Sequence, residues 1–356
     1  MTAAHLFTPL KLRDVELRNR IGVSPMCQYS SEDGFANDWH LVHLGSRAVG
    51  GAALVLTEAA AVLAEGRISP DDLGIWKDEQ IEMLSRIFRF IDAQGAVPGM
   101  QLAHAGFKAS TSSPWKGHQP LDETQGGWTP IFAASAVPFD ASYQTPQALD
   151  RSGIDRVVAA FVAAAKRCEA AGGRVVEIHA AHGYLLHEFL SPLTNRRTDE
   201  FGGSFENRIR LLCQVVEAVR AVWPERFPLF VRISATDWTE GGWTGEESVA
   251  LGKKLKSLGV DLIDCSTGGA VPKAEIPVGP GYQLRFARAL RQQAEIGTAA
   301  VGMITSPTQA DQIIRSGDAD MIFMAREFLR DPYWPLHAAQ ALKQEMKTPP
   351  QYGRAF

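Results

Sequence analysis

Three proton donors lie within one short segment of the chain, Ile-His-Ala-Ala-His-Gly-Tyr at positions 178–184. His179 and His182 are three residues apart, and Tyr184 follows two residues later. A neutral imidazole offers one N–H and a phenol one O–H. Because the apolar pair at 175–176 precedes them, we expect these residues to follow a buried strand. Donors grouped at a strand's end can polarise a carbonyl or nitro oxygen and deliver a proton beside it.

Two other interpretations of these histidines stay open. Side chains at this spacing can ligate a metal, but zinc sites usually need a third protein ligand and none stands close by in the sequence. The two rings could also be core histidines whose hydrogen bonds are satisfied within the protein. Of these readings we favour the proton-donor site, and we expect no metal.

The composition is that of an ordinary globular protein. The chain has 356 residues, is 45% hydrophobic and 21% charged, and carries a formal charge of -4. This balance gives no reason to expect a nucleic-acid partner, and no apolar run reaches the ~20 residues that a membrane span needs. We see no signal peptide at the start of the chain. The cysteines show no C-x-x-C spacing, so we expect reduced thiols and a cytoplasmic protein; they are Cys27, Cys168, Cys213 and Cys265.

Short apolar strands alternate with helices along the whole chain. The strands expected from apolar runs are 21–23, 52–56, 97–102, one that begins at 175, 229–233, 262–265, 299–302 and 321–324. The helices expected between and after them are 39–49, 78–94, 155–171, 205–223, 245–258, 283–295, 307–316 and 334–347. Uniformly apolar strands are buried on both faces, which predicts a parallel sheet and an α/β fold.

Eight such units in a chain of this length predict a closed (β/α)8 TIM barrel forming a single domain over 1–356. An open doubly wound sheet is the alternative, and the absence of G-x-G-x-x-G after the first strand disfavours it. Two irregular stretches, 111–143 and 191–207, are expected as excursions at the carboxyl ends of the strands, the first as a lid. The last residues, 348–356, form a tail.

In this barrel the active site lies where the strands end. Several polar or small residues occupy those positions: Ser24, Met26, Cys27, Ala59, Gln101, Arg232, Gly302, Ala325 and Arg326. Gln101 and Arg232 suit a flat heterocycle with amide-like groups, while Gly302 and Arg326 suit a phosphate. A ring with a phosphate tail suggests flavin mononucleotide. Each residue alone has a plainer explanation, such as a tethered loop, a surface ion pair or a small buried thiol. It is their shared position at the strand ends that indicates a cofactor site.

Longer motifs carry a family resemblance that covers the chain from about residue 6 to the end. The chain resembles the Old Yellow Enzyme family of FMN-dependent ene-reductases, and more closely the thermophilic-like bacterial branch that includes the xenobiotic reductases. The matching segments are Leu-Arg-Asn-Arg-Ile at 17–21, Ser-Pro-Met-Cys-Gln-Tyr at 24–29, Asp-Trp-His at 38–40, Glu-Gly-Arg-Ile at 65–68, Gln-Leu-Ala-His-Ala-Gly at 101–106, His-Ala-Ala-His-Gly-Tyr-Leu at 179–185, Leu-Ser-Pro at 190–192, Arg-Thr-Asp-Glu-Phe-Gly-Gly-Ser at 197–204 and Asn-Arg at 207–208.

The resemblance implies where the cofactor would bind. The residues that it assigns to the FMN ring are Ser24, Pro25, Met26, Cys27, Ala59, Gln101 and Arg232. Gly302, Ala325 and Arg326 would hold the phosphate, with Ala325 standing where the family often has glycine. NADPH or NADH would be the hydride donor.

The resemblance also implies the roles of the histidine segment. His179 and His182 would hydrogen-bond the oxygen of an enone or nitro substrate, and Tyr184 would protonate the α-carbon after hydride reaches the β-carbon. Cys27 would tune the flavin and touch the substrate, and Tyr29 would line the pocket.

Two features of the sequence bear on assembly and specificity. Arg354 matches an arginine that reaches a neighbouring subunit's substrate site in this branch, which implies a homodimer or a dimer of dimers. Phe107 stands where the family usually has arginine, so the partner of that arginine must be satisfied otherwise. A dienoyl-CoA reductase relative, a non-catalytic flavin-binding barrel and a metal-dependent hydrolase remain the alternatives.

Overall fold

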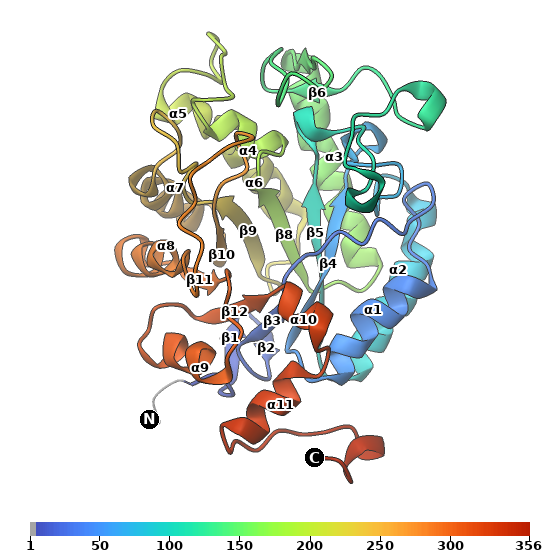
Figure 1. The fold of residues 1–356 in the computed structure, drawn as a ribbon, viewed down its shortest axis with the longest axis vertical. Coiled ribbons are helices and arrows are strands. Elements are labelled where there is room, and N and C mark those ends of the chain that lie inside the picture. The colour runs from blue at the N-terminus through green and yellow to red at the C-terminus, as the bar shows by residue number, and fades with distance from the viewer. Residues whose placement is uncertain (1–4) are drawn as a thin grey trace.

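The computed structural model describes residues 5–356 and has the architecture that the alternating pattern predicts: eight parallel strands close into a barrel and helices surround it (Figure 1). Residues 1–4 lie outside the described part, and with them most of the segment for which no signal peptide is expected. The barrel order is β10-β11-β12-β3-β4-β5-β8-β9. The strands are β3 (Ile21–Val23), β4 (Leu54–Ala61), β5 (Val97–Ala103), β8 (Val175–Ala180), β9 (Leu229–Ser234), β10 (Leu262–Ser266), β11 (Gly297–Ala300) and β12 (Met321–Met324).

The helices follow the strands in turn and pack on the outside of the barrel. The longer ones are α1 (Asp38–Val49), α2 (Ile81–Ala93), α3 (Arg151–Ala170), α6 (Arg210–Val222), α7 (Gly245–Ser257), α9 (Pro307–Arg315) and α11 (Trp334–Ala341). Shorter ones are α4 (Leu185–Leu190), α5 (Phe205–Arg208), α8 (Leu284–Ala289) and α10 (Arg326–Arg330). Within residues 5–356, no helix is both long enough and apolar enough to cross a bilayer.

The amino-terminal end of the barrel is closed by a hairpin that the apolar pattern did not reveal. Strands β1 (Leu10–Leu12) and β2 (Val15–Leu17) pair antiparallel, and Val15 and Leu17 share one apolar cluster with Leu54, Val97 and Leu262 at the starts of barrel strands. Side chains fill this end, so the opposite, carboxyl-terminal end is the open mouth.

Several element boundaries differ from the predicted ones for local reasons. The helix that was predicted from 155 begins at Arg151, because the Asp150 carboxylate caps it by accepting from Gly153 N–H. The helix that was predicted to run to 347 ends at Ala341, and Lys343 then adopts a left-handed conformation (φ 54°) that no helix continues through. The strand that was predicted to end at Leu56 continues to Ala61 past a bulge.

Three further helices depart from the predicted pattern. The predicted helix 205–223 is split at Ile209 into α5 and α6, and the predicted helix 283–295 turns from α8 into a π-helical turn at Leu290–Ala294. The short helix α4, directly after the histidine segment, was not predicted. Six residues are too few for an apolar period to show.

The excursion at 111–143 projects beyond the mouth of the barrel. It contains only short 3-10 turns and strand β6 (Phe132–Ala133), which pairs with β7 (Gln147–Ala148). Figure 1 shows this part above the carboxyl ends of β4 and β5, whereas the C-terminal tail lies at the far end beside α11.

Candidate functional site

Three side chains converge where β8 ends. His179 lies in β8, and its ring centroid is 5.2 Å from that of His182 and 5.0 Å from that of Tyr184. The chain reverses through His182 and Gly183, both left-handed (φ 60° and 74°). A Cβ at position 183 would lie 2.1 Å from the Gly269 carbonyl oxygen, so only glycine fits there. The spacing of the three donors in the sequence therefore becomes proximity in space.

Side chains from three other strand ends hold this turn. His182 N–H donates to Ser234 Oγ (2.9 Å), and His182 Nε2 lies 2.7 Å from Ser266 Oγ. The partly buried Lys108 side chain donates through its ammonium to the carbonyl oxygens of His182 and Gly269, both at 2.7 Å. The turn is thus tied to the ends of β5, β9 and β10. Lys108 was not singled out from the sequence, and its position shortly after β5 was the available signal.

The electrostatic environment fixes the protonation of these groups. Burial, with the nearby Arg232 cation next in size, holds the pKa of both His179 and His182 well below the usual range. Burial and then the Cys27 thiol raise the pKa of Tyr184 well above its usual value. At neutral pH the site therefore presents two neutral imidazoles and a protonated phenol.

A row of polar side chains crosses the barrel interior beneath this turn. Gln101 Nε2 donates to Glu177 Oε1 at 2.8 Å. Arg232 Nε lies 3.1 Å from Asp264 Oδ2, and an Arg232 terminal nitrogen donates to Ser24 Oγ (3.0 Å) on the opposite wall of the barrel. Burial raises the pKa of Glu177 and of Asp264, and Arg232 opposes the rise in both.

Glu177 and Asp264 were not singled out from the sequence, although a signal was present. Each is a carboxylate inside an otherwise apolar strand, and such a residue needs a buried partner. The registers that pair Gln101 with Glu177 and Arg232 with Asp264 provide those partners. The carboxylates orient the two residues that the resemblance assigns to the FMN ring.

The loop after β3 reaches the same region. Cys27 and Tyr29 pack with Tyr184 and Ile68 in one apolar cluster, and Met26 packs against the main core. Burial, with nearby carboxylates adding to it, raises the pKa of Cys27, so its sulfur is a thiol. Pro25 lies in the same loop. Ala59 is buried on β4 in register with Gln101.

The ends of β11 and β12 line a separate cavity of about 420 Å³, and Gly302, Ala325 and Arg326 are among the residues around it. Gly302 has a φ of 120°, and a Cβ there would lie 2.7 Å from Gln283 Nε2. Arg326 is exposed, and among residues 5–356 its guanidinium has no hydrogen-bond or ion-pair partner. A glycine and an unpaired arginine, Gly302 and Arg326, thus lie around the same cavity, as their positions at strand ends in the sequence suggested.

The excursion and the tail differ in their relation to the mouth. Trp115 of the excursion packs edge-on against Tyr29, with ring centroids 5.6 Å apart. Arg354 instead lies in an exposed tail whose aromatic rings pack beside α11, where Tyr352 meets Tyr333. The structure therefore does not bring Arg354 to the site of its own chain.

Phe107 is buried beside the excursion. Its ring packs edge-on against Phe139 at 5.3 Å, and its backbone N–H donates to Glu188 Oε1 (2.8 Å). Glu188 Oε2 accepts from Ala134 N–H (2.9 Å), and burial raises the pKa of Glu188 to about 8. Backbone N–H groups thus satisfy the carboxyl group of Glu188, which lies next to Phe107, the residue that stands where the family usually has arginine.

Potential metal ligands are dispersed. Across residues 5–356, no group of three or more His, Cys, Asp or Glu side chains is arranged to hold a metal ion.

Comparison with known proteins gives the family. Residues 5–345 match the family model described as the NADH:flavin oxidoreductase / NADH oxidase family. The chain is 48% identical over 356 residues to an NADPH dehydrogenase of Bacillus velezensis, covering 99% of this chain and 100% of the relative. It is 49% identical over 358 residues to an NADPH dehydrogenase of Bacillus licheniformis, covering 100% of each.

Solved structures agree on the fold. Morphinone reductase superposes with a TM-score of 0.80 at 26% identity, over 98% of this chain and 93% of that one. A 2-naphthoyl-CoA reductase complex superposes with a TM-score of 0.86 at 26% identity over 95% of this chain, which spans 52% of that longer protein. The prediction of a (β/α)8 barrel is confirmed, and the chain is an oxidoreductase that belongs to the NADH:flavin oxidoreductase family, the family of the Old Yellow Enzymes.

Proposed function

We propose that this protein is an FMN-dependent NAD(P)H dehydrogenase that reduces activated alkenes, namely α,β-unsaturated carbonyl compounds and nitroalkenes. The observation that carries the proposal is the convergence of two neutral imidazoles and a protonated tyrosine at the mouth of the barrel. Neutral imidazole N–H groups suit an oxygen on which negative charge develops, and a phenol suits proton delivery. The names of the Bacillus relatives support the choice of NADPH, with NADH as the alternative donor.

The residues at the mouth fit FMN. His179 Nδ1 is a buried polar atom without a partner among the described residues, and buried polar atoms in proteins are nearly always hydrogen-bonded. Gln101 and Arg232, fixed by their carboxylates, offer amide and guanidinium groups for the polar edge of a flavin ring. Ser24 to Cys27 and Ala59 would complete the ring site, and Gly302, Ala325 and Arg326 would hold the phosphate.

When bound, FMN would pass a hydride, taken from NADPH or NADH, to the substrate's β-carbon. His179 and His182 would donate hydrogen bonds to the substrate's carbonyl or nitro oxygen as charge accumulates there. Tyr184 would then transfer its phenolic proton to the α-carbon. Arg232 would stabilise negative charge at the ring edge. Cys27, as a neutral thiol, would adjust the ring's potential without a covalent role, and Tyr29 would line the pocket.

The proposal is tested with two half-reactions. Under anaerobic conditions NADPH should bleach the yellow protein, and 2-cyclohexen-1-one should restore the colour with one saturated ketone formed per flavin. An enoyl-CoA thioester in a parallel cuvette tests the alternative substrate class to which the structural likeness to 2-naphthoyl-CoA reductase points. Protein that binds no flavin, or that NADPH reduces but no enone reoxidises, would refute the proposal.

We also propose that the protein acts as a homodimer, or a dimer of dimers, in the cytoplasm. The exposed tail, with Arg354 far from its own mouth, supports an intersubunit role, and the four free cysteines suit a reducing compartment. Removal of 348–356 should alter the apparent affinity for enone without loss of flavin. A monomer of full activity, by light scattering and steady-state kinetics, would exclude this role of Arg354.

A further inference from the structure

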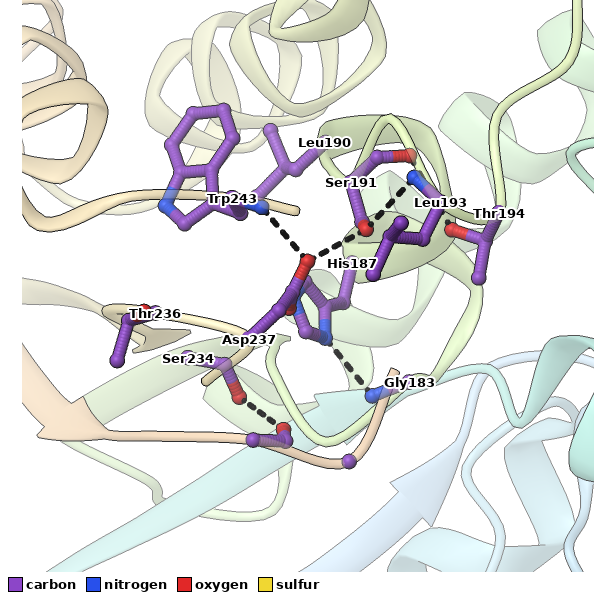
Figure 2. Close-up of polar contacts among 12 residues, drawn as sticks. Gly183, His187, Leu190, Ser191, Leu193, Thr194, Ser234, Thr236, Asp237 and Trp243 are labelled. Carbon is purple, nitrogen blue, oxygen red and sulfur yellow. Dashed lines mark hydrogen bonds and ion pairs between the residues drawn. The ribbon is translucent and has the colours of Figure 1, made fainter. Parts of the chain in front are cut away.

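A buried histidine–aspartate pair lies directly behind the histidine turn (Figure 2). His187 is on α4, and Asp237 follows β9; both side chains are 0% exposed, and His187 Nε2 lies 3.0 Å from Asp237 Oδ1. The proposed reaction uses neither residue. Figure 2 shows the imidazole between the carboxylate on one side and the backbone of Gly183 on the other.

The hydrogen bonds fix the tautomer of His187. Gly183 N–H donates to His187 Nδ1 (2.8 Å), so this nitrogen must carry a lone pair and the ring proton must sit on Nε2. Nε2 is the ring nitrogen nearest Asp237 and lies 3.0 Å from its Oδ1, an electrostatic contact. Within the described residues, neither atom has any other polar partner. The carboxylate therefore selects the tautomer that can accept from Gly183.

The carboxylate itself is held rigidly. Asp237 Oδ2 accepts from Ser191 Oγ (2.6 Å) and from the backbone N–H of Trp243 (2.7 Å). Burial alone would raise the pKa of Asp237, but His187 and these two donors outweigh it and lower that pKa. Asp237 is therefore an anion with both oxygens engaged, and it cannot rotate away from the imidazole.

The turn depends on this support because its backbone is strained. His182 is a non-glycine residue in the left-handed region, and Gly183 continues in the same region. The His182 N–H and carbonyl are bound by Ser234 and Lys108, which leaves the Gly183 N–H as the next link before Tyr184. His187 holds that link. Without it, the peptide before Gly183 can rotate and move the His182 and Tyr184 side chains together.

We propose that His187 and Asp237 form a positioning unit that, through the Gly183 amide, sets the relative placement of the His182 imidazole and the Tyr184 phenol. The tautomer of His187 and the hydrogen bond from the Gly183 amide are inferred from geometry alone. The effect on substrate binding rests on the function proposed above. The unit links the loop after β9 to the turn after β8, so residues from both strand ends position the side chains of one site.

Substitutions can separate positioning from simple packing. In His187→Asn the side-chain oxygen can take the place of Nδ1 and still accept from Gly183, although it is too short to reach Asp237. In His187→Gln the amide can reach Asp237, but no acceptor remains opposite Gly183. A purely structural role would make these two variants similar, whereas the positioning role makes them differ.

Asp237→Asn inverts the tautomer without changing shape. The Trp243 N–H can only donate, so the asparagine oxygen must face it and the NH₂ must face His187. His187 would then accept on Nε2 and carry its proton on Nδ1, directly opposite the Gly183 N–H. Ser191→Ala is the matched control, because it also removes a bond to Asp237 but leaves the tautomer unchanged.

The readouts use the FMN-loaded protein. With phenol as the probe of the oxygen site, His187→Gln and Asp237→Asn should weaken binding about tenfold or more, the effect of one lost hydrogen bond, and should lower kcat for 2-cyclohexen-1-one. His187→Asn and Ser191→Ala should stay within about threefold on the same scale. All four should keep their flavin. Equal phenol affinity in the Asn and Gln variants of His187 would overturn the proposal.

A second measurement does not depend on activity or on any variant folding. In protein labelled with ¹⁵N-histidine, the His187 ring should show a protonated Nε2 and an unprotonated Nδ1, and the Gly183 amide should exchange slowly with solvent. A protonated Nδ1 in the wild-type protein would refute the positioning unit. Wild-type protein that neither binds phenol nor reduces an enone, yet shows the expected tautomer, would refute only the proposed function.

Discussion

The two halves of the barrel mouth are built differently. At the end of β8, His179 is buried, His182 and Tyr184 are mostly covered, and bonds from Ser234 and Lys108 hold the turn in place within the chain. At the ends of β11 and β12 the structure has a cavity of about 420 Å³ and an exposed, unpaired guanidinium among the described residues. The half at β8 is preorganised, whereas the half at β11 and β12 has a cation, Arg326, that is available to bind a ligand.

This difference follows from the chemistry that each half would perform. Groups that stabilise charge during a reaction gain most when they are fixed beforehand in a buried setting, since no reorganisation is then needed. A phosphate anchor only contributes binding, and an exposed arginine can close on its ligand at little cost. We therefore expect substitutions at β8 to affect turnover, and substitutions at β11 and β12 to affect cofactor affinity.

The largest effect should come from the proton donor. Tyr184→Phe keeps the ring that packs on His179 but removes the O–H, so enone reduction should slow by about 10² to 10⁴, the usual contribution of a general acid. Flavin reduction by NADPH should be unaffected. Stopped-flow measurement of the two half-reactions separates these rates. An equal loss in both would contradict the role of Tyr184 as proton donor and show that the substitution only disrupted the β8 side of the mouth.

The imidazole pair should govern binding of the substrate oxygen. Replacing both His179 and His182 by alanine removes two donors to a charged oxygen, and phenol should bind at least about a hundredfold more weakly while flavin is retained. His118→Ala, on the exposed excursion, is the control. Phenol titration followed in the flavin spectrum decides the matter, and unchanged affinity in the double variant would remove the oxygen clamp.

Arg326→Ala should affect only the half of the mouth at the ends of β11 and β12. Loss of a charge-assisted contact to phosphate should weaken FMN binding by about tenfold or more, with the difference from wild type shrinking at high salt. The rate of enone reduction at saturating FMN should not change. Arg315→Ala, whose guanidinium pairs with Asp311 on α9, is the matched control in an equilibrium dialysis of FMN. An indifferent Arg326→Ala would show that the cavity is not the phosphate site.

The smallest effect concerns pH and the carboxylate beside Phe107. Burial raises the pKa of Glu188 to about 8, so the folded chain holds this proton more tightly than the unfolded chain does. Stability from this group is present at low pH and is lost as the pH rises from the ordinary carboxyl range toward about 8. Between about pH 5 and pH 8.5 the Tm of wild type should therefore fall more than that of Glu188→Gln.

Parallel unfolding curves for wild type and Glu188→Gln would contradict the raised pKa. Phe107→Arg extends the same test, because a cation near Glu188 should favour the charged carboxylate and flatten the dependence of Tm on pH. We also expect this substitution to change the substrate range or the assembly. If neither changes, the difference at position 107 is neutral for function.

The sequence predicted much of the barrel because its strands are continuous apolar runs, and it placed His179, Gln101 and Arg232 at strand ends correctly. It missed the hairpin β1–β2, whose strands Leu10–Leu12 and Val15–Leu17 each have a charged residue in the middle and so form no continuous apolar run. It also missed the His187–Asp237 contact. The two residues are fifty positions apart, and the parallel pairing of β8 with β9 brings them together. The role across a subunit interface that the resemblance implies for Arg354 stays a prediction.

The central claim is that the β8 turn faces a bound flavin and clamps a substrate oxygen. A crystal structure of the FMN-loaded protein with phenol tests it most directly. We expect the phenol to stack over the ring, with its oxygen at about 2.7 to 3.2 Å from a nitrogen of His179 and of His182. Imidazoles turned away from the mouth, or a flavin bound elsewhere, would contradict it.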